Sequence, residues 1–271
     1  MLIAVDTGGT KTLIASFDEA GNKETIAKFP TPRDIPGYLE TVTSHIHGHT
    51  SVTDIQAISV AMPGPIRDKK VLRTPNIGWA DFDVINDLGT IFPGVPIFLQ
   101  NDAALAGLAE AREFGSKGGL VVYVTLSTGV GGGISYNGRL LSEELERFEA
   151  GSMRAEYEGR LQRWENIASG KSFYERYGLF GSDVNDPIIW HDYAERVAVG
   201  LQILISLLEP DHLVIGGSMG THFAKYADQL HVILNDRIAK HTAVSTISQA
   251  ARPEEAVIYG CYYYALDSLT A

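Results

Sequence analysis

Short apolar runs and polar turns alternate along the chain in a pattern typical of α/β proteins. The first two runs, 2–5 and 13–15, flank a glycine turn and predict an N-terminal β-hairpin. Other short apolar runs predict strands at 23–29, 55–61, 96–100, 119–126 and 212–215. Apolar residues at helical spacing predict helices at 34–49, 83–92, 103–111, 188–208, 221–238 and 254–269. The charged segment 141–181 gives no clear prediction.

Composition narrows the class of protein. A chain of 271 residues with 45% hydrophobic residues suits a well-formed core in two lobes. Its formal net charge of −11 argues against nucleic acid and against an anionic membrane as partners. Cys261 is the single cysteine, which suits a reducing compartment, and residues 197–208, the most apolar stretch, are too short to span a bilayer. No signal peptide is recognised, so we expect a cytoplasmic protein.

The turn between the first two strands carries candidate phosphate-binding groups. Asp6, Thr10 and Lys11 surround Gly8 and Gly9, where the missing side chains let backbone N–H groups approach a ligand. A carboxylate, a hydroxyl and an ammonium beside such a turn suit a Mg²⁺-bound polyphosphate. An ordinary tight hairpin explains the same residues, so this turn alone leaves both interpretations open.

A second glycine turn follows the predicted strand 119–126. Ser127, Thr128 and Gly129 open it, about 120 residues after the first turn. Two such turns, each preceded by an apolar strand, suggest two related lobes that face one cleft and hold phosphate from both sides. Small residues at 216–218 follow another strand and offer a flat surface for adenine or ribose, although a plain strand-to-helix turn explains them equally well.

Two further segments carry candidate chemistry. Asn101 and Asp102 end the predicted strand 96–100 and precede a helix, at the strand end where α/β folds place reactive groups. Capping that helix would need only one of the two residues, which favours a functional role for the other. Asn76 lies in a loop with Trp79 and offers a donor and an acceptor to sugar hydroxyls, although packing of the tryptophan also explains this loop.

Taken together, these motifs resemble the ROK family of sugar kinases, within the actin-like ATPase superfamily. The resemblance rests on residues 6–11, 63–65, 75–79, 101–103, 127–134, 149–151 and 215–217. It implies a two-lobed α/β fold, ribonuclease H-like, with mixed β-sheets flanked by helices around a central cleft. The N-terminal lobe would be 1–112, completed by the C-terminal helix 254–271, and the C-terminal lobe would be 113–253.

The resemblance also implies roles for individual residues. Asp102 resembles the general base that deprotonates a sugar hydroxyl as it attacks the γ-phosphoryl of ATP. The implied sugar-binding residues are Asn76, Asn101, Asp102, Glu149, Ser152 and Glu165. The implied nucleotide-binding residues are Asp6, Gly8, Gly9, Thr10, Lys11, Ser127, Thr128, Gly129, Gly216, Gly217 and Ser218. Mg²⁺ would enter with ATP, near Asp6.

One motif departs from the family pattern. Many ROK proteins carry a histidine after the Glu-x-Gly motif and three cysteines that bind zinc. Here Ser152 replaces the histidine, and Glu156, Glu158 and Arg163 replace the cysteines. Structural zinc prefers thiolate and imidazole ligands, so we expect no zinc. Packing, or an ion pair of Arg160 or Arg163 with a nearby glutamate, would hold this segment instead.

The resemblance implies an ATP-dependent kinase acting on glucose or a related hexose, usually as a homodimer. Phosphorylation of N-acetylmannosamine, or use of polyphosphate as donor, is an alternative within the same class. A sugar-responsive regulator is an alternative of another class. It is disfavoured because the first strand begins at residue 2, without a preceding helix-turn-helix, and because the chain is acidic.

Overall fold

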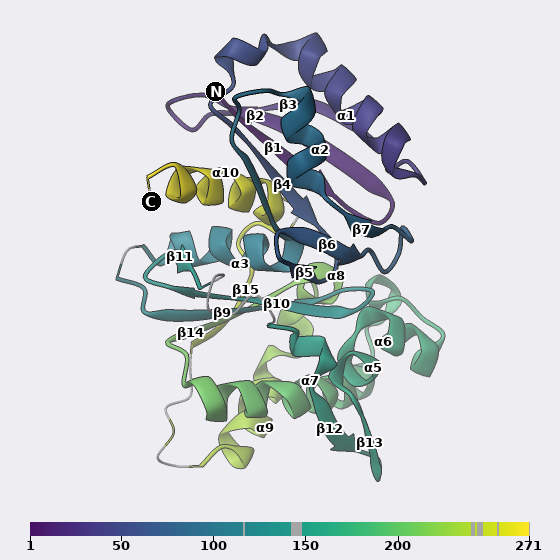
Figure 1. The fold of residues 1–271 in the computed structure, drawn as a ribbon. Helices are drawn as coiled ribbons and strands as arrows, with labels where there is room; N and C mark the ends of the chain where they lie inside the picture. The colour runs from purple at the N-terminus through teal and green to yellow at the C-terminus, as the bar shows by residue number, and fades with distance from the viewer. Residues whose placement is uncertain (116, 142–147, 240–241, 243–245, 254, 271) are drawn as a thin grey trace. The chain divides into compact units, whose positions relative to one another are not determined.

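The computed structural model describes residues 1–115, 117–141, 148–239, 242, 246–253 and 255–270 (Figure 1). These residues form two compact units. The chain leaves the first unit within α3 (Asp102–Glu113), between Ala109 and Glu110, and α10 (Ala256–Leu269) belongs again to the first. The boundary expected at residue 112 lies in the same helix. Residues 254 and 271, the expected ends of the last helix, lie outside the described residues.

A five-stranded sheet forms the first unit, in the order β3-β2-β1-β4-β8. Its strands are β1 (Leu2–Thr7), β2 (Lys11–Phe17), β3 (Lys23–Pro30), β4 (Ala57–Met62) and β8 (Ile97–Asn101). The predicted hairpin is confirmed by the antiparallel pairing of β1 with β2, and β1, β4 and β8 run parallel. The carboxyl ends of these three strands therefore meet at one edge of the sheet.

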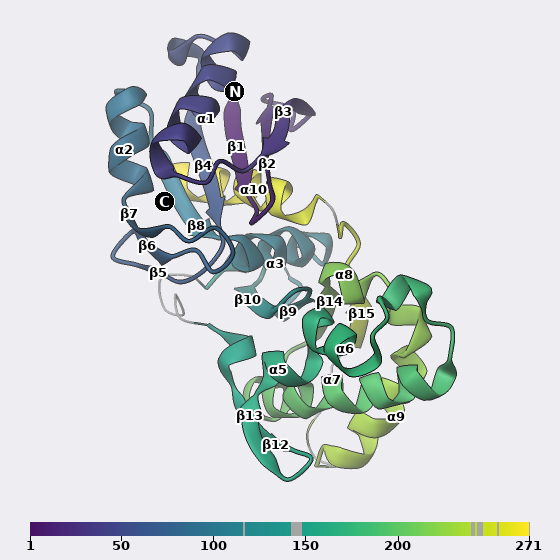
Figure 2. The ribbon, with the colours of Figure 1, turned by 90° about the vertical axis from the view of Figure 1, so that its right-hand side faces the viewer.

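Helices cover both faces of this sheet (Figure 2). On one face, α1 (Ile35–His49) and α2 (Val84–Ile91) pack Val42 and Leu88 into a core with Val5 and Val60. On the other face, Leu105 of α3 and Cys261 of α10 pack against Ala4. The predicted helices 34–49 and 83–92 are confirmed, and in both the predicted first residue is an aspartate N-cap.

Gly260 lets α10 approach the backbone of α3. A Cβ at Gly260 would overlap the carbonyl oxygen of Leu105. We therefore expect Gly260→Ala to destabilise the protein by about 1–3 kcal/mol, measured by urea unfolding. Gly48 of α1 is a matched control, because a Cβ there meets nothing within 4 Å. Gly48→Ala is expected to be neutral or stabilising, and equal losses in both variants would contradict this account.

A second, small sheet in the first unit was missed by the sequence analysis. It consists of β5 (Ile66–Arg67), β6 (Lys70–Arg73) and β7 (Ala80–Phe82). Two of these strands have only two or three residues, too few to show an alternating pattern. The loop between β6 and β7 carries Asn76.

The second unit contains a sheet in the order β11-β10-β9-β14-β15. Its strands are β9 (Leu120–Leu126), β10 (Val130–Tyr136), β11 (Arg139–Leu140), β14 (His212–Gly216) and β15 (Thr246–Gln249). Its other elements are the hairpin β12 (Arg154–Tyr157) and β13 (Arg160–Arg163), and the helices α5 (Trp164–Ala168), α6 (Gly170–Tyr177), α7 (Pro187–Leu208), α8 (Gly217–Gly220) and α9 (Ala227–Arg237). Short 3₁₀ turns are η1 (Val52–Asp54) in the first unit, and η2 (Ala150–Ser152), η3 (Gly181–Asp183) and η4 (Phe223–Lys225) in the second.

The helix predicted over 221–238 is confirmed only for its second half. In the first part only the short turn η4 is helical, and α9 begins after Tyr226. Tyr226 is fully buried and stacks on Trp190 of α7, with ring centroids 5.8 Å apart. Packing of these aromatic rings takes precedence over helical spacing here.

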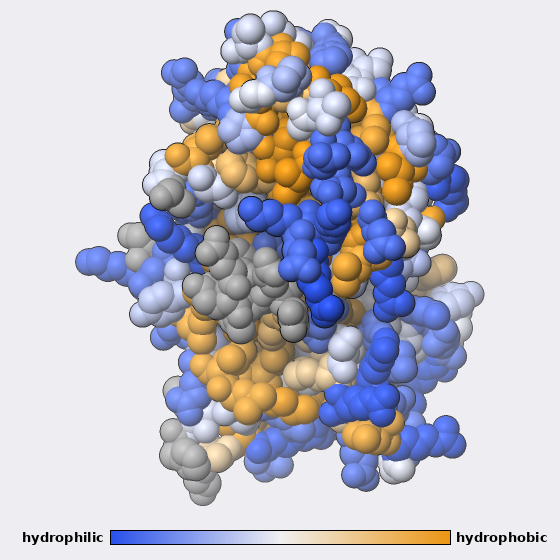
Figure 3. Space-filling view, in the orientation of Figure 1, coloured by the Kyte–Doolittle hydropathy of each residue, from blue (hydrophilic) through white to orange (hydrophobic). Residues whose placement is uncertain are grey.

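The surface in Figure 3 is largely hydrophilic, in keeping with the acidic composition. One apolar area lies over α7 (Figure 3). Leu207, near the end of this helix, is 74% exposed. Among the residues that the structure describes, no helix combines the length and apolar character needed to cross a membrane.

Candidate functional site

The β1–β2 turn is the first part of the candidate site. The Gly8 amide donates to the Lys11 carbonyl over 2.9 Å, and Thr10 and Lys11 are exposed. Thr31 fixes the turn from outside: its hydroxyl donates to the Gly8 carbonyl (2.7 Å) and its amide to the Thr10 carbonyl (3.0 Å). Thr31 was not predicted from the sequence, because one threonine after a strand carries no distinguishing signal.

Asn76 lies against this turn. A Cβ at Gly9 would come within 2.8 Å of the Asn76 Cβ, so glycine is needed for the approach. The Asn76 loop is closed by a hydrogen bond from the Thr74 amide to the Trp79 carbonyl (2.9 Å). The Trp79 indole donates to the Arg33 carbonyl (2.9 Å). The fold therefore brings a candidate phosphate turn and a candidate sugar residue together within one unit.

Asn101 caps helix α3. Its Oδ1 accepts from the Ala103 and Ala104 amides (3.0 and 3.2 Å), and its Nδ2 donates to the Gly64 carbonyl (3.1 Å). Asp102 is half-buried, and its Oδ1 also accepts from the Ala103 amide (2.8 Å). Asn101 thus accepts from two amides at the start of the helix and attaches it to the turn at Gly64, whereas Asp102 shares only the Ala103 amide.

Asp6 stands near Asp102 at the same edge of the sheet. In the register of the parallel strands, Asp6 is level with Ala61 of β4, which is level with Gln100 of β8. Burial first, and then the charge of Asp102, raise the pKa of Asp6 from 3.8 to about 7, while Lys28 lowers it. A carboxyl group whose ionisation is disfavoured by burial and by a neighbouring carboxylate is suited to receiving a cation.

The second glycine turn joins β9 and β10. Within it, the Ser127 amide donates to the Gly129 carbonyl (2.9 Å), and the Ser127 carbonyl accepts from the Gly170 amide (2.6 Å). The Ser127 hydroxyl accepts from the Ser218 amide (3.1 Å). The candidate phosphate residues at 127–129 and the candidate nucleotide residues at 216–218 therefore lie side by side.

Gly217 is essential to that arrangement. Its φ is +78°, which favours glycine. A Cβ there would lie 2.6 Å from the Leu126 carbonyl oxygen and 2.6 Å from the hydroxyls of Thr125 and Ser127. The backbone after β14 can pass the second glycine turn only because no side chain intervenes.

Three candidate sugar residues belong to the second unit. Glu149 and Ser152 are exposed and lie at the two ends of one turn, closed by a bond from the Ser152 amide to the Glu149 carbonyl (2.9 Å). Between them, a Cβ at Gly151 would overlap the Val130 carbonyl oxygen, so this turn lies directly on the start of β10.

Glu165 is brought to the same region. The Trp164 amide donates to the Met153 carbonyl (2.8 Å), which joins α5 to the residue after Ser152. The Glu165 Oε2 lies 3.4 Å from the position that a Cβ on Gly129 would occupy. The second unit thus places Glu165 beside its glycine turn.

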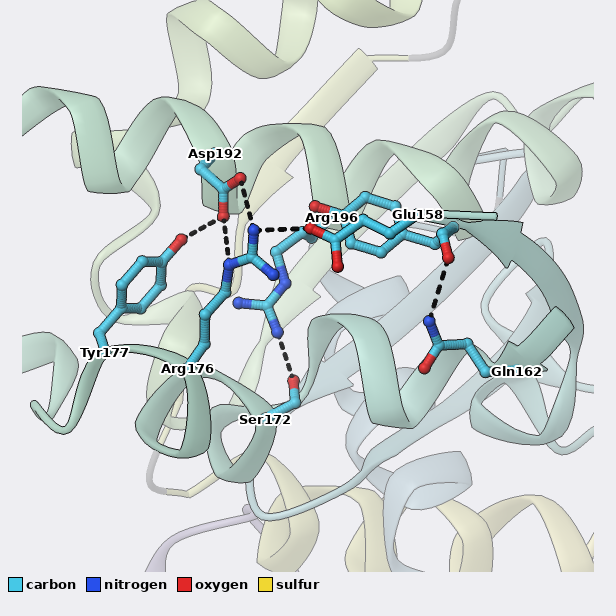
Figure 4. A network of polar contacts seen from close by, with 8 residues as sticks. Glu158, Gln162, Ser172, Arg176, Tyr177, Asp192 and Arg196 are labelled. Carbon is cyan, nitrogen blue, oxygen red and sulfur yellow. Dashed lines mark hydrogen bonds and ion pairs between the residues drawn. The ribbon is translucent and has the colours of Figure 1, made fainter. Parts of the chain in front are cut away.

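Ion pairs occupy two of the positions of the missing cysteines, and Figure 4 shows the one that Glu158 makes. Arg163 contacts Glu165 over 3.1 Å, which confirms the predicted ion pair of Arg163 with a nearby glutamate. Glu158 pairs with Arg176 of α6 over 2.7 Å, a partner that the sequence analysis missed. No group of three or more His, Cys, Asp or Glu side chains that could hold a metal occurs in the described part of the chain.

Comparison with known proteins identifies the family. The model of the ROK family matches residues 2–268. The chain belongs to the ROK family. A glucokinase of Streptomyces coelicolor is 27% identical over 262 residues, covering 81% of this chain and 82% of that protein. An N-acetylmannosamine kinase of Yersinia pestis is 34% identical over 145 residues, covering 51% and 48%.

Comparison with solved structures shows the fold. The ROK glucokinase of Streptomyces griseus, solved with glucose and AMPPNP, has a TM-score of 0.77 at 24% identity and covers 98% of this chain and 99% of its own. ROK sugar kinases have the actin-like ATPase fold, so the predicted α/β fold class is confirmed.

Proposed function

We propose that this ROK protein is an ATP-dependent hexose kinase, most simply acting on the 6-hydroxyl of glucose or a related hexose. The observation that carries the proposal is the pair Asp6 and Asp102 at one sheet edge, in the unit where the Gly8–Gly9 turn lies against Asn76. A cation-receptive carboxyl, a candidate base and a bare-backbone turn are what phosphoryl transfer to an alcohol requires.

Asp102 acts as the general base in this proposal. The sugar hydroxyl oxygen attacks the γ-phosphorus of ATP, a new O–P bond forms, and the bond from phosphorus to the β–γ bridging oxygen breaks. The hydroxyl proton passes to the Asp102 carboxylate and ADP leaves. Because Asn101 accepts from both the Ala103 and the Ala104 amide, the cap of α3 does not rest on Asp102 alone, and its carboxylate is suited to a chemical role.

The remaining candidate residues bind the two substrates. Carboxylates of Glu149 and Glu165 suit vicinal sugar hydroxyls, because each oxygen accepts a hydrogen bond that a deoxy sugar would leave unmade. The turns at 8–11 and 127–129 would hold phosphates through backbone amides, and 216–218 would lie along the nucleoside.

Magnesium fits the chemistry of Asp6. A half-buried carboxyl with a pKa raised to about 7 becomes ionised more readily beside a cation. Bound with ATP, Mg²⁺ would neutralise phosphate charge.

A coupled ADP-release assay tests the proposal. The assay compares four sugars, glucose, mannose, fructose and N-acetylmannosamine, first with ATP and then with polyphosphate as the phosphoryl donor. N-acetylmannosamine is included because the N-acetylmannosamine kinase of Yersinia pestis has a higher identity over its matched region than the glucokinase has over its own. Turnover of one or more hexoses with ATP is expected. A folded sample that binds ATP and turns over no sugar contradicts the proposal, and binding of DNA at low salt would then favour a regulator.

Gly217 provides a test of the nucleotide segment. Gly217→Ala is expected to raise KM for ATP by about tenfold or more, because the new methyl group would displace the backbone from Ser127. Gly178 is the matched control, since it has a φ of +67° but a Cβ there meets nothing within 4 Å. The KM for ATP should stay near the wild-type value in Gly178→Ala, and an equal rise in both variants would attribute the effect to backbone strain.

A further inference from the structure

The hairpin β12–β13 stands where the family resemblance implies a zinc site, and its residues do not fit zinc. Glu158 and Arg163, at two of the three cysteine positions, are both engaged in ion pairs, and an arginine there would repel the metal. We propose that two arginines take over the task of the metal: Arg176 fixes the tip of the hairpin, and Arg163 orients Glu165. The second part rests on the proposed sugar kinase activity.

The tip of the hairpin is fixed by one guanidinium group. Glu158 and Gly159 form a two-residue turn with φ values of +51° and +71°. Arg176 of α6 donates to the Glu158 carboxylate (2.7 Å) and contacts Asp192 of α7 (3.2 Å), to which the Tyr177 hydroxyl also donates (Figure 4). Hairpin, α6 and α7 are therefore joined at Arg176, as a metal with ligands from several segments would join them.

These groups are partly exposed, which determines what the network can do. The side chains of Arg176 and Glu158 are 36% and 56% exposed. Exposed ion pairs add little to global stability and weaken in salt. The ion pairs of Arg176 are thus suited to fixing the position of the hairpin tip, and they contribute little to the stability of the whole fold.

The backbone and the side chain of Glu165 are fixed by different contacts. The preceding residue, Trp164, is fully buried, and its indole donates to the Arg196 carbonyl (3.3 Å). A Cβ at Gly200 would overlap the Trp164 ring, so α5 is tightly seated on α7. The backbone of Glu165 is therefore fixed by packing, whereas its carboxylate is contacted by Arg163 at Oε1.

That contact makes Arg163 a positioning residue. With Oε1 taken by the guanidinium, Oε2 is the oxygen on the side of Gly129. A charge-assisted hydrogen bond restricts rotation of the carboxylate. Arg163 thus orients Glu165 so that Oε2 can accept a hydrogen bond from a sugar hydroxyl. In the family motif, the position of Arg163 is that of a cysteine that binds the metal.

The first experiment examines the hairpin without using activity. Hydrogen exchange of residues 154–163 is measured in the wild type, with and without EDTA, and in Arg176→Met, Arg176→Lys and Lys171→Met. Lys171 of α6 is the matched control, because its ion pair with Glu175 (3.7 Å) lies on the same helix but does not touch the hairpin. We expect faster exchange in Arg176→Met and in high salt, partial recovery in Arg176→Lys, and no change with EDTA or in Lys171→Met.

The second experiment uses kinetics. Arg163→Met is expected to raise KM for the sugar by about tenfold, with a smaller effect on KM for ATP, and Arg163→Lys should recover part of the loss. Absence of sugar turnover in the wild type would refute the proposed function and leave the exchange experiment valid. The inference would be overturned if the protein bound one equivalent of zinc or if EDTA made hydrogen exchange of the hairpin faster. It would also be overturned if the KM for the sugar were unchanged in Arg163→Met.

Discussion

Asp102→Asn is expected to lower kcat by a factor of about 10²–10⁴, the usual contribution of a positioned general base. The asparagine amide has the shape of the carboxylate but cannot accept the hydroxyl proton. The KM values for sugar and ATP should change much less, because the amide oxygen still accepts a hydrogen bond from the sugar. Steady-state kinetics in the ADP-release assay measure both effects.

Stability should be preserved in this variant. The cap of α3 is made by Asn101, and an asparagine at 102 still offers an oxygen to the Ala103 amide. Asp68→Asn is the control. Asp68 is an exposed carboxylate in the same unit, and we propose no role for it. If kcat falls equally in both variants, or if Asp102→Asn unfolds the protein, the general-base role loses its support.

The sequence predicted those parts of the site that depend on local patterns. A glycine turn between two apolar runs predicts a hairpin whatever the rest of the chain does, and both glycine turns are present. Asparagine and aspartate together at a strand end indicated more than a helix cap, and in the structure Asn101 accepts from two amides of the helix while Asp102 accepts from one of them. The roles of these residues in binding and catalysis stay predictions.

Parts that depend on contacts between distant residues were not predictable. Arg176 lies 18 residues after Glu158, in a charged segment without periodicity, so nothing linked the two. Thr31 acts on the first glycine turn from the far end of β3. Whether Asp6 is ionised depends on its burial and on Asp102, which are properties of the folded sheet and not of the motif.

Asp6→Asn is expected to stabilise the protein at alkaline pH and to reduce its activity. The pKa of Asp6 is raised from 3.8 to about 7, so between these values the folded state binds more protons than the unfolded state. The free energy of unfolding of the wild type therefore falls as the pH rises through this window. An asparagine cannot ionise, so the free energy of unfolding of the variant does not fall in this way as the pH rises.

The raised pKa of Asp6 also gives the size of the expected change in stability. Relative to the wild type, Asp6→Asn should gain up to about 3 kcal/mol between pH 5 and pH 8, measured by urea unfolding without Mg²⁺. Activity should fall because the neutral amide attracts Mg²⁺ and its nucleotide less than a carboxylate does. A stability difference that is the same at both pH values would mean that Asp6 is already ionised at pH 5, and the half-buried carboxyl would then not destabilise the fold. If the predicted gain is found together with lost activity, the protein keeps a destabilising acid at the sheet edge for the sake of the reaction, as expected for a group that serves a ligand and not the fold.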